Sequence, residues 1–144
     1  LVVSWGWESE NPGHSKFLDW HEWQGTRDMS AFLTIPKAVE FLNKNNWLKV
    51  GKKCKEEVIR TRNRFLNMLK IAPSCPDNWL GQMASIPLPI DDADLMKKTL
   101  LENYKIQIPI FKWEGKIYLR YSVQAYNTSA DLDKLFNVVK EILS

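Results

Sequence analysis

Apolar residues in the middle of the chain recur at helical spacing. From residue 28 onward they stand three and four positions apart, which predicts a helix that Asp28 or Ser30 caps. Pro36 would kink or restart this helix, and the asparagine-rich stretch at residues 43–46 would end it. The pattern therefore predicts one interrupted helix in this part of the chain.

A second and longer amphipathic helix is predicted over residues 47–70. Its apolar positions trace one face, and they are Trp47, Val50, Cys54, Val58, Phe65 and Leu69. Its basic positions lie on the other faces, and they are Lys49, Lys52, Lys53, Arg60 and Arg64. The Ala-Pro-Ser-Cys-Pro stretch at residues 72–76 stops this helix, because proline lacks an amide proton and restricts the residue before it.

The last part of the chain alternates between strand and helix patterns. The predicted elements are a strand at 82–89, a helix at 91–103, a strand at 106–112, a strand at 116–123 and a helix that Ser129 caps. A turn at 113–115 joins the last two strands as a hairpin. The order β-α-β-β-α predicts an α+β fold, in which helices cover one face of a small antiparallel sheet of about three strands.

The first 27 residues have a different character and are expected to form an irregular arm. Four of the seven tryptophans of the chain fall in its first 23 residues, namely Trp5, Trp7, Trp20 and Trp23. These rings carry much surface to bury, yet the segment shows little helical or strand periodicity. Two interpretations are open: the arm packs against something outside this chain, or it folds over its own domain.

Composition narrows the class of protein. A chain of 144 residues with 44% hydrophobic and 26% charged residues matches one globular domain over residues 1–144. Its formal charge of +3 is too small to imply nucleic acid by itself. Cys54 and Cys75 lack metal-ligand spacing and are expected to be reduced thiols, which fits a cytoplasmic protein. No apolar run approaches the length of a membrane span, so we expect no contact with a membrane. We also expect no metal site, because the two cysteines lack metal-ligand spacing.

Arg120 is the first residue that could carry chemistry. It stands within an apolar strand just before a polar turn at Tyr126 and Asn127. A guanidinium is costly to bury without an anion, and its planar fork suits a carboxylate. The open alternative is an arginine on an edge strand that points into water.

A second anion site is possible at Gly25 and Thr26, directly before the first predicted helix. The unpaired N–H groups of a helix N-terminus attract anions, and Arg27 adds positive charge. A solvated loop with a helix cap is the open alternative. His14 and His21 show no triad or metal pattern and are expected at the surface, although His21 could face a ligand.

Three stretches together resemble a known family. They are residues 23–30 (WQGTRDMS) with the helix that follows, residues 111–115 (FKWEG) and residues 119–127 (LRYSVQAYN). The chain is similar to the carboxyl-terminal part of class V aminotransferase-type enzymes that depend on pyridoxal phosphate (PLP). The branch that it resembles is isopenicillin N epimerase-like and includes cysteine desulfhydrases. The resemblance implies the small domain of a fold-type-I PLP enzyme.

The resemblance also implies roles for individual residues. Gly25 and Thr26 would contact the cofactor phosphate of the partner subunit in a homodimer, and Arg120 would hold the α-carboxylate of an amino-acid substrate. Further residues that would line the site are Trp23, Gln24, Arg27, Tyr126 and Asn127.

One element of the family is missing from this sequence. The lysine that binds PLP covalently belongs to the large domain upstream in the family, and Lys16 lacks its flanking residues. We therefore expect part of a longer enzyme of epimerase, carbon–sulfur lyase (desulfhydrase) or aminotransferase type, with no catalytic residue in this chain and no activity when isolated. Its expected partners are the missing large domain and a second subunit.

Two other functions are compatible with the same sequence. One is a free-standing α+β interaction module that uses the basic helix over residues 47–70 to bind an acidic partner or nucleic acid, although no aromatic residues interleave with its lysines. The other is a non-catalytic paralogue that keeps the fold without the chemistry.

Overall fold

A computed structural model describes residues 15–22 and 25–144 of the chain. The chain divides into two compact units, Leu1–Asn45 and Asn46–Ser144. Trp5, Trp7, His14, Trp23 and Gln24 lie outside the described residues. The single domain that composition suggests for residues 1–144 stays a prediction.

The described part of the first unit, residues 15–22 and 25–45, contains the short helices α1 (Lys16–Glu22), α2 (Ser30–Leu33) and α3 (Ile35–Lys44). The predicted restart at Pro36 is confirmed, because α3 begins beside it after a break at Thr34. The N-cap of α2 is Met29, which makes no side-chain cap hydrogen bond, so the predicted cap at Asp28 or Ser30 is wrong. Asp28 lies one residue earlier and accepts a hydrogen bond from the backbone N–H of Ser30 at 2.8 Å. Helix α1 lies within the segment that was expected to be irregular, because a helix of seven residues leaves little periodicity in the sequence.

No residue between positions 30 and 44 is buried. The apolar side chains of this stretch are at least 40% exposed, and they include Phe32, Leu33, Ile35, Val39, Phe41 and Leu42. A short helix gains most of its stability from packing an apolar face against something else. The first unit therefore presents an exposed apolar surface, which we call the α2–α3 stripe.

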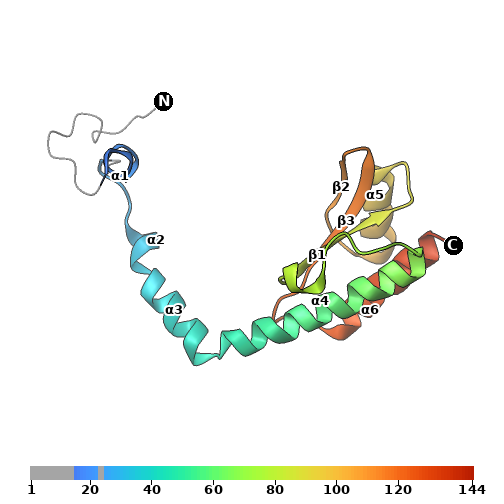
Figure 1. Ribbon diagram of the computed structural model, residues 1–144, viewed down its shortest axis with the longest axis horizontal. Helices are drawn as coiled ribbons and strands as arrows, with labels where there is room; N and C mark the ends of the chain where they lie inside the picture. Colours follow the sequence, from blue (N-terminus) through green and yellow to red (C-terminus); the bar gives the residue numbers. More distant parts are fainter. Residues whose placement is uncertain (1–14, 23–24) are drawn as a thin grey trace. The chain divides into compact units, whose positions relative to one another are not determined.

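The second unit has the predicted α+β order (Figure 1). Its elements are α4 (Trp47–Leu69), the 3-10 turn η2 (Asp77–Trp79), β1 (Met83–Leu88), α5 (Ala93–Tyr104), β2 (Ile110–Trp113), β3 (Lys116–Ser122) and α6 (Ser129–Ile142). From β1 onward this is the β-α-β-β-α order expected from the sequence. The α+β prediction and its three-stranded antiparallel sheet are confirmed.

The three strands lie in the order β1-β3-β2, so the last strand in the sequence is the central one. Strand β3 pairs antiparallel with both neighbours, with Ile86 and Ile110 on either side of Leu119. Strands β1 and β2 are therefore parallel, and the chain crosses between them through α5.

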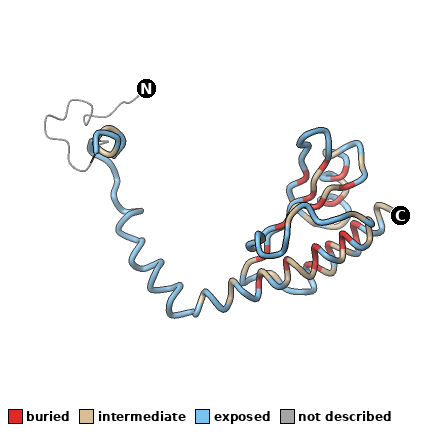
Figure 2. Tube along the Cα trace, in the orientation of Figure 1, coloured by how far each residue is buried: buried red, intermediate tan, exposed pale blue. Residues whose placement is uncertain are grey.

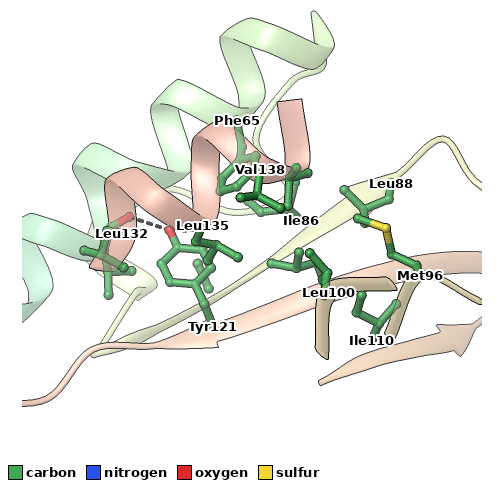
Figure 3. Close-up of a cluster of buried hydrophobic side chains, with 14 of the residues drawn as sticks. Phe65, Ile86, Leu88, Met96, Leu100, Ile110, Tyr121, Leu132, Leu135 and Val138 are labelled. Carbon is green, nitrogen blue, oxygen red and sulfur yellow. Dashed lines mark hydrogen bonds between the residues drawn. The ribbon is translucent and has the colours of Figure 1, made fainter. Parts of the chain in front are cut away.

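The core lies on one face of this sheet (Figure 2). Alternate residues of the strands point into it, among them Ile86, Leu119 and Tyr121, because successive side chains of a strand face opposite sides. Helices α4, α5 and α6 contribute the other side of the same cluster, as Figure 3 shows for Phe65, Leu100 and Leu135 among others.

Two buried groups tie the sheet to α4. The Tyr121 hydroxyl donates a hydrogen bond of 2.7 Å to the backbone carbonyl of Val58 (Figure 3). Phe65 of α4 also packs against the Tyr121 ring, with ring centroids 6.4 Å apart. The central strand is thus fixed against the long helix by both packing and a hydrogen bond.

Two predicted details differ from the structure. Thr128, not Ser129, caps α6, and Thr128 and Asp131 form a reciprocal capping box. Strand β2 starts at Ile110 instead of residue 106, because Pro109 has no N–H to donate to a ladder. Pro109 still accepts a hydrogen bond from the Arg120 N–H at 2.9 Å, so the segment before β2 runs beside β3.

Candidate functional site

Arg120 lies on the face of the sheet opposite the core. Its neighbours in β3, Leu119 and Tyr121, are buried, so the alternation of the strand turns Arg120 outward. Within residues 46–144, no helix covers this side of the sheet, which we call the open face (Figure 2). The alternative that placed Arg120 on an edge strand is wrong, because β3 is central, although the side chain is exposed as that alternative expected.

The charge of Arg120 has no anionic partner among the described residues. None of residues 15–22 and 25–144 forms a hydrogen bond or an ion pair with its guanidinium. Its nearest described partner is the ring of Phe111, whose centroid lies 5.8 Å from Cζ. All five N–H donors of this side chain are therefore available to a ligand.

Arg120 borders a groove with a volume of about 490 Å³ at the carboxyl end of β3. The segment that precedes β2 and the start of α6 form its other walls, and they contribute Lys105, Gln107 and Lys134. Asn127 also lines this groove, whereas Tyr126 is 82% exposed and does not line it. The structure thus brings Arg120 together with Asn127 but not with Tyr126.

The turn before α6 holds Asn127 in place. Its side-chain Oδ1 accepts a hydrogen bond of 2.8 Å from the Gln124 N–H, and its own N–H donates to the Gln124 carbonyl at 2.9 Å. The Oδ1 atom is therefore engaged within the turn. The side-chain NH₂ of Asn127 is the group that could donate to a ligand in the groove.

Positive charge dominates the groove. Lys105, Arg120 and Lys134 line it together with a single carboxylate, that of Asp131. The backbone N–H and the hydroxyl of Thr128 both donate to this carboxylate and hold the pKa of Asp131 below its usual value. Asp131 is thereby committed to the helix cap, and the three cations favour an anionic ligand.

Sequence reasoning missed the lysines and Gln107 of this groove. Lys105 fell between the predicted helix and the predicted strand, and Gln107 fell within that strand. Nothing in their spacing separates them from ordinary surface residues. Their place beside Arg120 follows from the crossover that brings β2 next to β3. No local signal could have identified them.

The second candidate anion site, at Gly25 and Thr26, lies in the first unit. Gly25 has φ +71°, a left-handed conformation that favours glycine, and open space surrounds the position of a Cβ. Arg27 lies over the Phe32 ring, with Cζ 5.0 Å from the centroid. Asp28 already accepts from Ser30, whose side chain and backbone N–H both donate to its carboxylate and lower the Asp28 pKa. The Arg27 Nε also donates to Met29 Sδ at 3.4 Å. The turn therefore offers a hydroxyl and backbone N–H groups, and it adds the positive charge of a guanidinium that already has contacts, beside one carboxylate.

The basic helix of the alternative function is largely neutralised along its second half. Arg60 pairs with Glu57, Arg64 pairs with Asp133 and the buried Arg62 pairs with Asp77. Arg62 is only 4% exposed and also donates to the Cys75 carbonyl at 2.9 Å, so it fastens the segment after α4 to the helix. These arginines serve the fold, which leaves mainly the lysines of α4 for an acidic partner.

Other candidate chemistry is sparse in the described ranges. Cys54 is buried and Cys75 half-buried, and both are free. His21 packs against Phe17 in α1, with ring centroids 4.5 Å apart. Within residues 15–22 and 25–144, no group of three His, Cys, Asp or Glu side chains could hold a metal ion. No helix in these ranges is long and apolar enough to cross a membrane.

The fold and the site define a small α+β unit with an arginine on an open sheet face beside a cationic groove, and this arginine has no anionic partner among residues 15–22 and 25–144. The chain is similar to isopenicillin N epimerase of Amycolatopsis lactamdurans, with 29% identity over 153 residues that span 97% of this chain and 38% of that protein. It is also similar to two Arabidopsis thaliana proteins, named L-cysteine desulfhydrase (26% identity, 84% of this chain and 32% of that protein) and probable chloroplastic L-cysteine desulfhydrase (28%, 84% and 29%).

These relatives confirm the resemblance that the sequence indicates. The chain is a relative of isopenicillin N epimerase and the L-cysteine desulfhydrases, and it spans roughly a third of their length. No model of a known protein family matches it.

Proposed function

We propose that this chain is the small domain of a PLP-dependent enzyme that acts on an amino acid, and that Arg120 binds the α-carboxylate of the substrate. The observation that carries the proposal is the uncompensated guanidinium of Arg120 on the open face. The names of the relatives, an epimerase and desulfhydrases that act on amino-acid compounds, support an enzyme of this kind.

The chemistry of the groove supports a carboxylate ligand. A guanidinium offers two parallel N–H donors that match the two oxygens of a carboxylate. Lys105 and Lys134 add positive charge along the same groove, and the side-chain NH₂ of Asn127 adds a neutral donor. Arg120 would orient the substrate by its carboxylate, so that the bonds to Cα keep a fixed direction.

The described residues fit one part of PLP, its phosphate. Thr26, the backbone after Gly25 and the Arg27 guanidinium are donors, and the open left-handed turn lets the backbone approach an anion. When bound, PLP supplies an electron sink for the substrate Cα. In our proposal, Gly25 and Thr26 contact the phosphate in the partner subunit of a homodimer, and Trp23, Gln24 and Arg27 line that site.

The proposal assigns no lysine of this chain to the covalent cofactor bond. Lys16 is exposed and lies in α1, nine residues ahead of Gly25. The chain alone should therefore be inactive. Incubation of the purified chain with PLP and borohydride should label no single lysine selectively, and a stoichiometric adduct at one lysine would contradict this part of the proposal.

Two uncovered surfaces support a missing large domain as a partner. The α2–α3 stripe and the open face both expose apolar side chains, which is unusual for a surface that meets only water. The relatives are about three times as long as this chain, so the part of each relative that this chain does not match is long enough to form a further large domain. We propose that the preceding domain of the same polypeptide covers at least one of these surfaces.

The central experiment uses the complete polypeptide of the natural protein. It is assayed with L-cysteine, L-alanine and L-aspartate, which separates lyase, epimerase and aminotransferase chemistry by product. Replacing Arg120 by alanine should raise KM by about 10- to 100-fold, the effect of losing a charged hydrogen-bonded pair.

Lys112→Ala is the matched control, because Lys112 is an exposed cation of the neighbouring strand β2 and does not line the groove. A wild-type KM in the Arg120→Ala variant would remove Arg120 from the site. Turnover of none of the three amino acids would contradict the proposed function itself.

A further inference from the structure

The β2–β3 hairpin fixes which side chains share the open face with Arg120. Its loop consists of Glu114 and Gly115, both with positive φ (47° and 76°), which is the backbone of a tight two-residue hairpin turn. This turn sets Trp113 opposite Lys116 and Phe111 opposite Tyr118. Because Arg120 follows Tyr118 by two residues, it stands diagonally across from Phe111 on the same face.

Three aromatic rings make a continuous row on that face. Phe111 and Tyr118 stack with centroids 5.9 Å apart and an angle of 20° between the rings, and Trp113 meets Tyr118 edge-on at 6.2 Å. We call Phe111, Trp113 and Tyr118 the aromatic row. Phe111 is 36% exposed and Trp113 is 58% exposed, so the core gains little from either ring.

Arg120 stands at the Phe111 end of the aromatic row. Its Cζ lies 5.8 Å from the Phe111 centroid, within the range of a cation–π contact. A guanidinium that lies over a ring uses its face for this contact, whereas it binds a carboxylate through the N–H groups at its edge. The two contacts are therefore compatible. The cation–π contact already restricts the rotamers of Arg120, so less side-chain entropy is lost when a carboxylate binds.

We propose that Phe111 is a positioning residue, which holds the Arg120 guanidinium ready for the substrate carboxylate. This inference rests on the proposed function of Arg120 and deepens it. Tyr118 supports Phe111 by stacking, and the Glu114–Gly115 turn secures the register, since a slip of one residue would move Phe111 to the other face of the sheet.

The first test measures the contact itself by NMR of the 144-residue chain. The protons of the Arg120 side chain, assigned with Arg120→Lys, should show an upfield ring-current shift in the wild type. Phe111→Leu should abolish the shift, because leucine keeps an apolar side chain but has no ring, and Phe111→Tyr should retain it. A shift that survives in Phe111→Leu would overturn the proposal.

The second test measures the consequence in the complete polypeptide, with the amino acid that it turns over. Phe111→Leu should raise KM about two- to five-fold, the fold-change expected for an exposed cation–π contact, with kcat nearly unchanged, and Phe111→Tyr should restore KM. Trp113→Leu is the matched control, because Trp113 belongs to the aromatic row but contacts Tyr118.

The outcomes separate the two proposals. A wild-type KM in Phe111→Leu, together with a raised KM in Arg120→Ala, would overturn the role of Phe111 and keep that of Arg120. A wild-type KM in Arg120→Ala would overturn both. An equal loss of kcat in Phe111→Leu and Trp113→Leu would indicate a structural role of the aromatic row and would also overturn the positioning role.

Discussion

Helices α3 and α6 are built from similar patterns but meet different surroundings. Leu132, Leu135 and Val139 of α6 are at most 5% exposed, whereas Ile35 and Val39 of α3 are 54% and 49% exposed. Both helices place apolar residues three and four positions apart. Spacing thus specifies a helix with an apolar face, but a helix is stabilised only by a surface that covers this face.

The contrast extends to the two units that contain these helices. Residues 46–144 enclose one core between the sheet and α4, α5 and α6, whereas residues 30–44 contain no buried side chain. Equivalent substitutions should therefore cost stability in the second unit and almost none in the first. Pairs of residues of the same type make this testable.

The largest effect should come from a pair of phenylalanines. Phe65→Ala should lower the free energy of unfolding by about 3–5 kcal/mol, because Phe65 is fully buried among the core side chains. Phe41→Ala in α3 should change it by less than about 0.5 kcal/mol, since Phe41 is 57% exposed. Urea unfolding of the chain measures both. An equal loss in the two variants would show that α3 packs into a core.

A pair of acidic residues should give the next effect. Asp77→Asn weakens the partner of the buried Arg62 and should cost about 1–3 kcal/mol, the range for hydrogen bonds to charged groups. Glu40→Gln breaks the exposed pair with Lys37 in α3 and should cost about 0–0.5 kcal/mol. The urea midpoints of the two variants measure both losses of stability. A larger loss in Glu40→Gln than in Asp77→Asn would contradict the structural role of the Arg62–Asp77 pair.

A pair of threonines tests helix capping. Thr128→Ala removes the capping box of α6 and should cost about 0.5–2 kcal/mol. Thr34→Ala, at the break between α2 and α3, removes only a hydroxyl that bonds to the Ala31 carbonyl, and should stay within about 0.5 kcal/mol. Thermal unfolding followed by circular dichroism measures both. A stable Thr128→Ala variant would mean that α6 is held by packing alone.

The smallest effect should be one of pH. The Arg64 guanidinium lowers the pKa of Asp133 below its ordinary value of 3.8. A carboxyl whose folded pKa is lowered adds stability above its unfolded pKa and loses it as pH falls through the folded pKa. The urea midpoint should therefore decline between about pH 5 and about pH 2, and less steeply in Asp133→Asn. A slope in Asp133→Asn equal to that of the wild type would contradict this role of the Arg64–Asp133 pair.

The sequence predicted the order of elements because that order depends on local signals. Prolines and the Gly115 turn mark the ends of elements, and apolar spacing marks their faces. The predicted start of β2 lies a few residues before the observed start at Ile110, and the predicted cap of α6 lies one residue after the observed cap at Thr128. Pro109 and the choice between Thr128 and Ser129 decide these ends through hydrogen bonds that a pattern of apolar positions does not contain.

The sequence also predicted Arg120 as a site residue, but it left the direction of the side chain open. An arginine in an apolar strand has two possible environments, and the choice depends on which face of the sheet the helices cover. Only the tertiary structure decided this, by burying Leu119 and Tyr121 and leaving the opposite face open.

By itself, then, the amino-acid sequence determined the α+β class, the hairpin, the resemblance to isopenicillin N epimerase-like enzymes and the two candidate anion contacts. Only the tertiary structure decided that β3 lies in the centre, that Arg62 is buried, and that Lys105, Lys134 and Phe111 lie near Arg120. The physical reason is that periodicity and turn chemistry act over a few residues. Strand order and the neighbours of a charge are set by contacts between segments far apart in the chain.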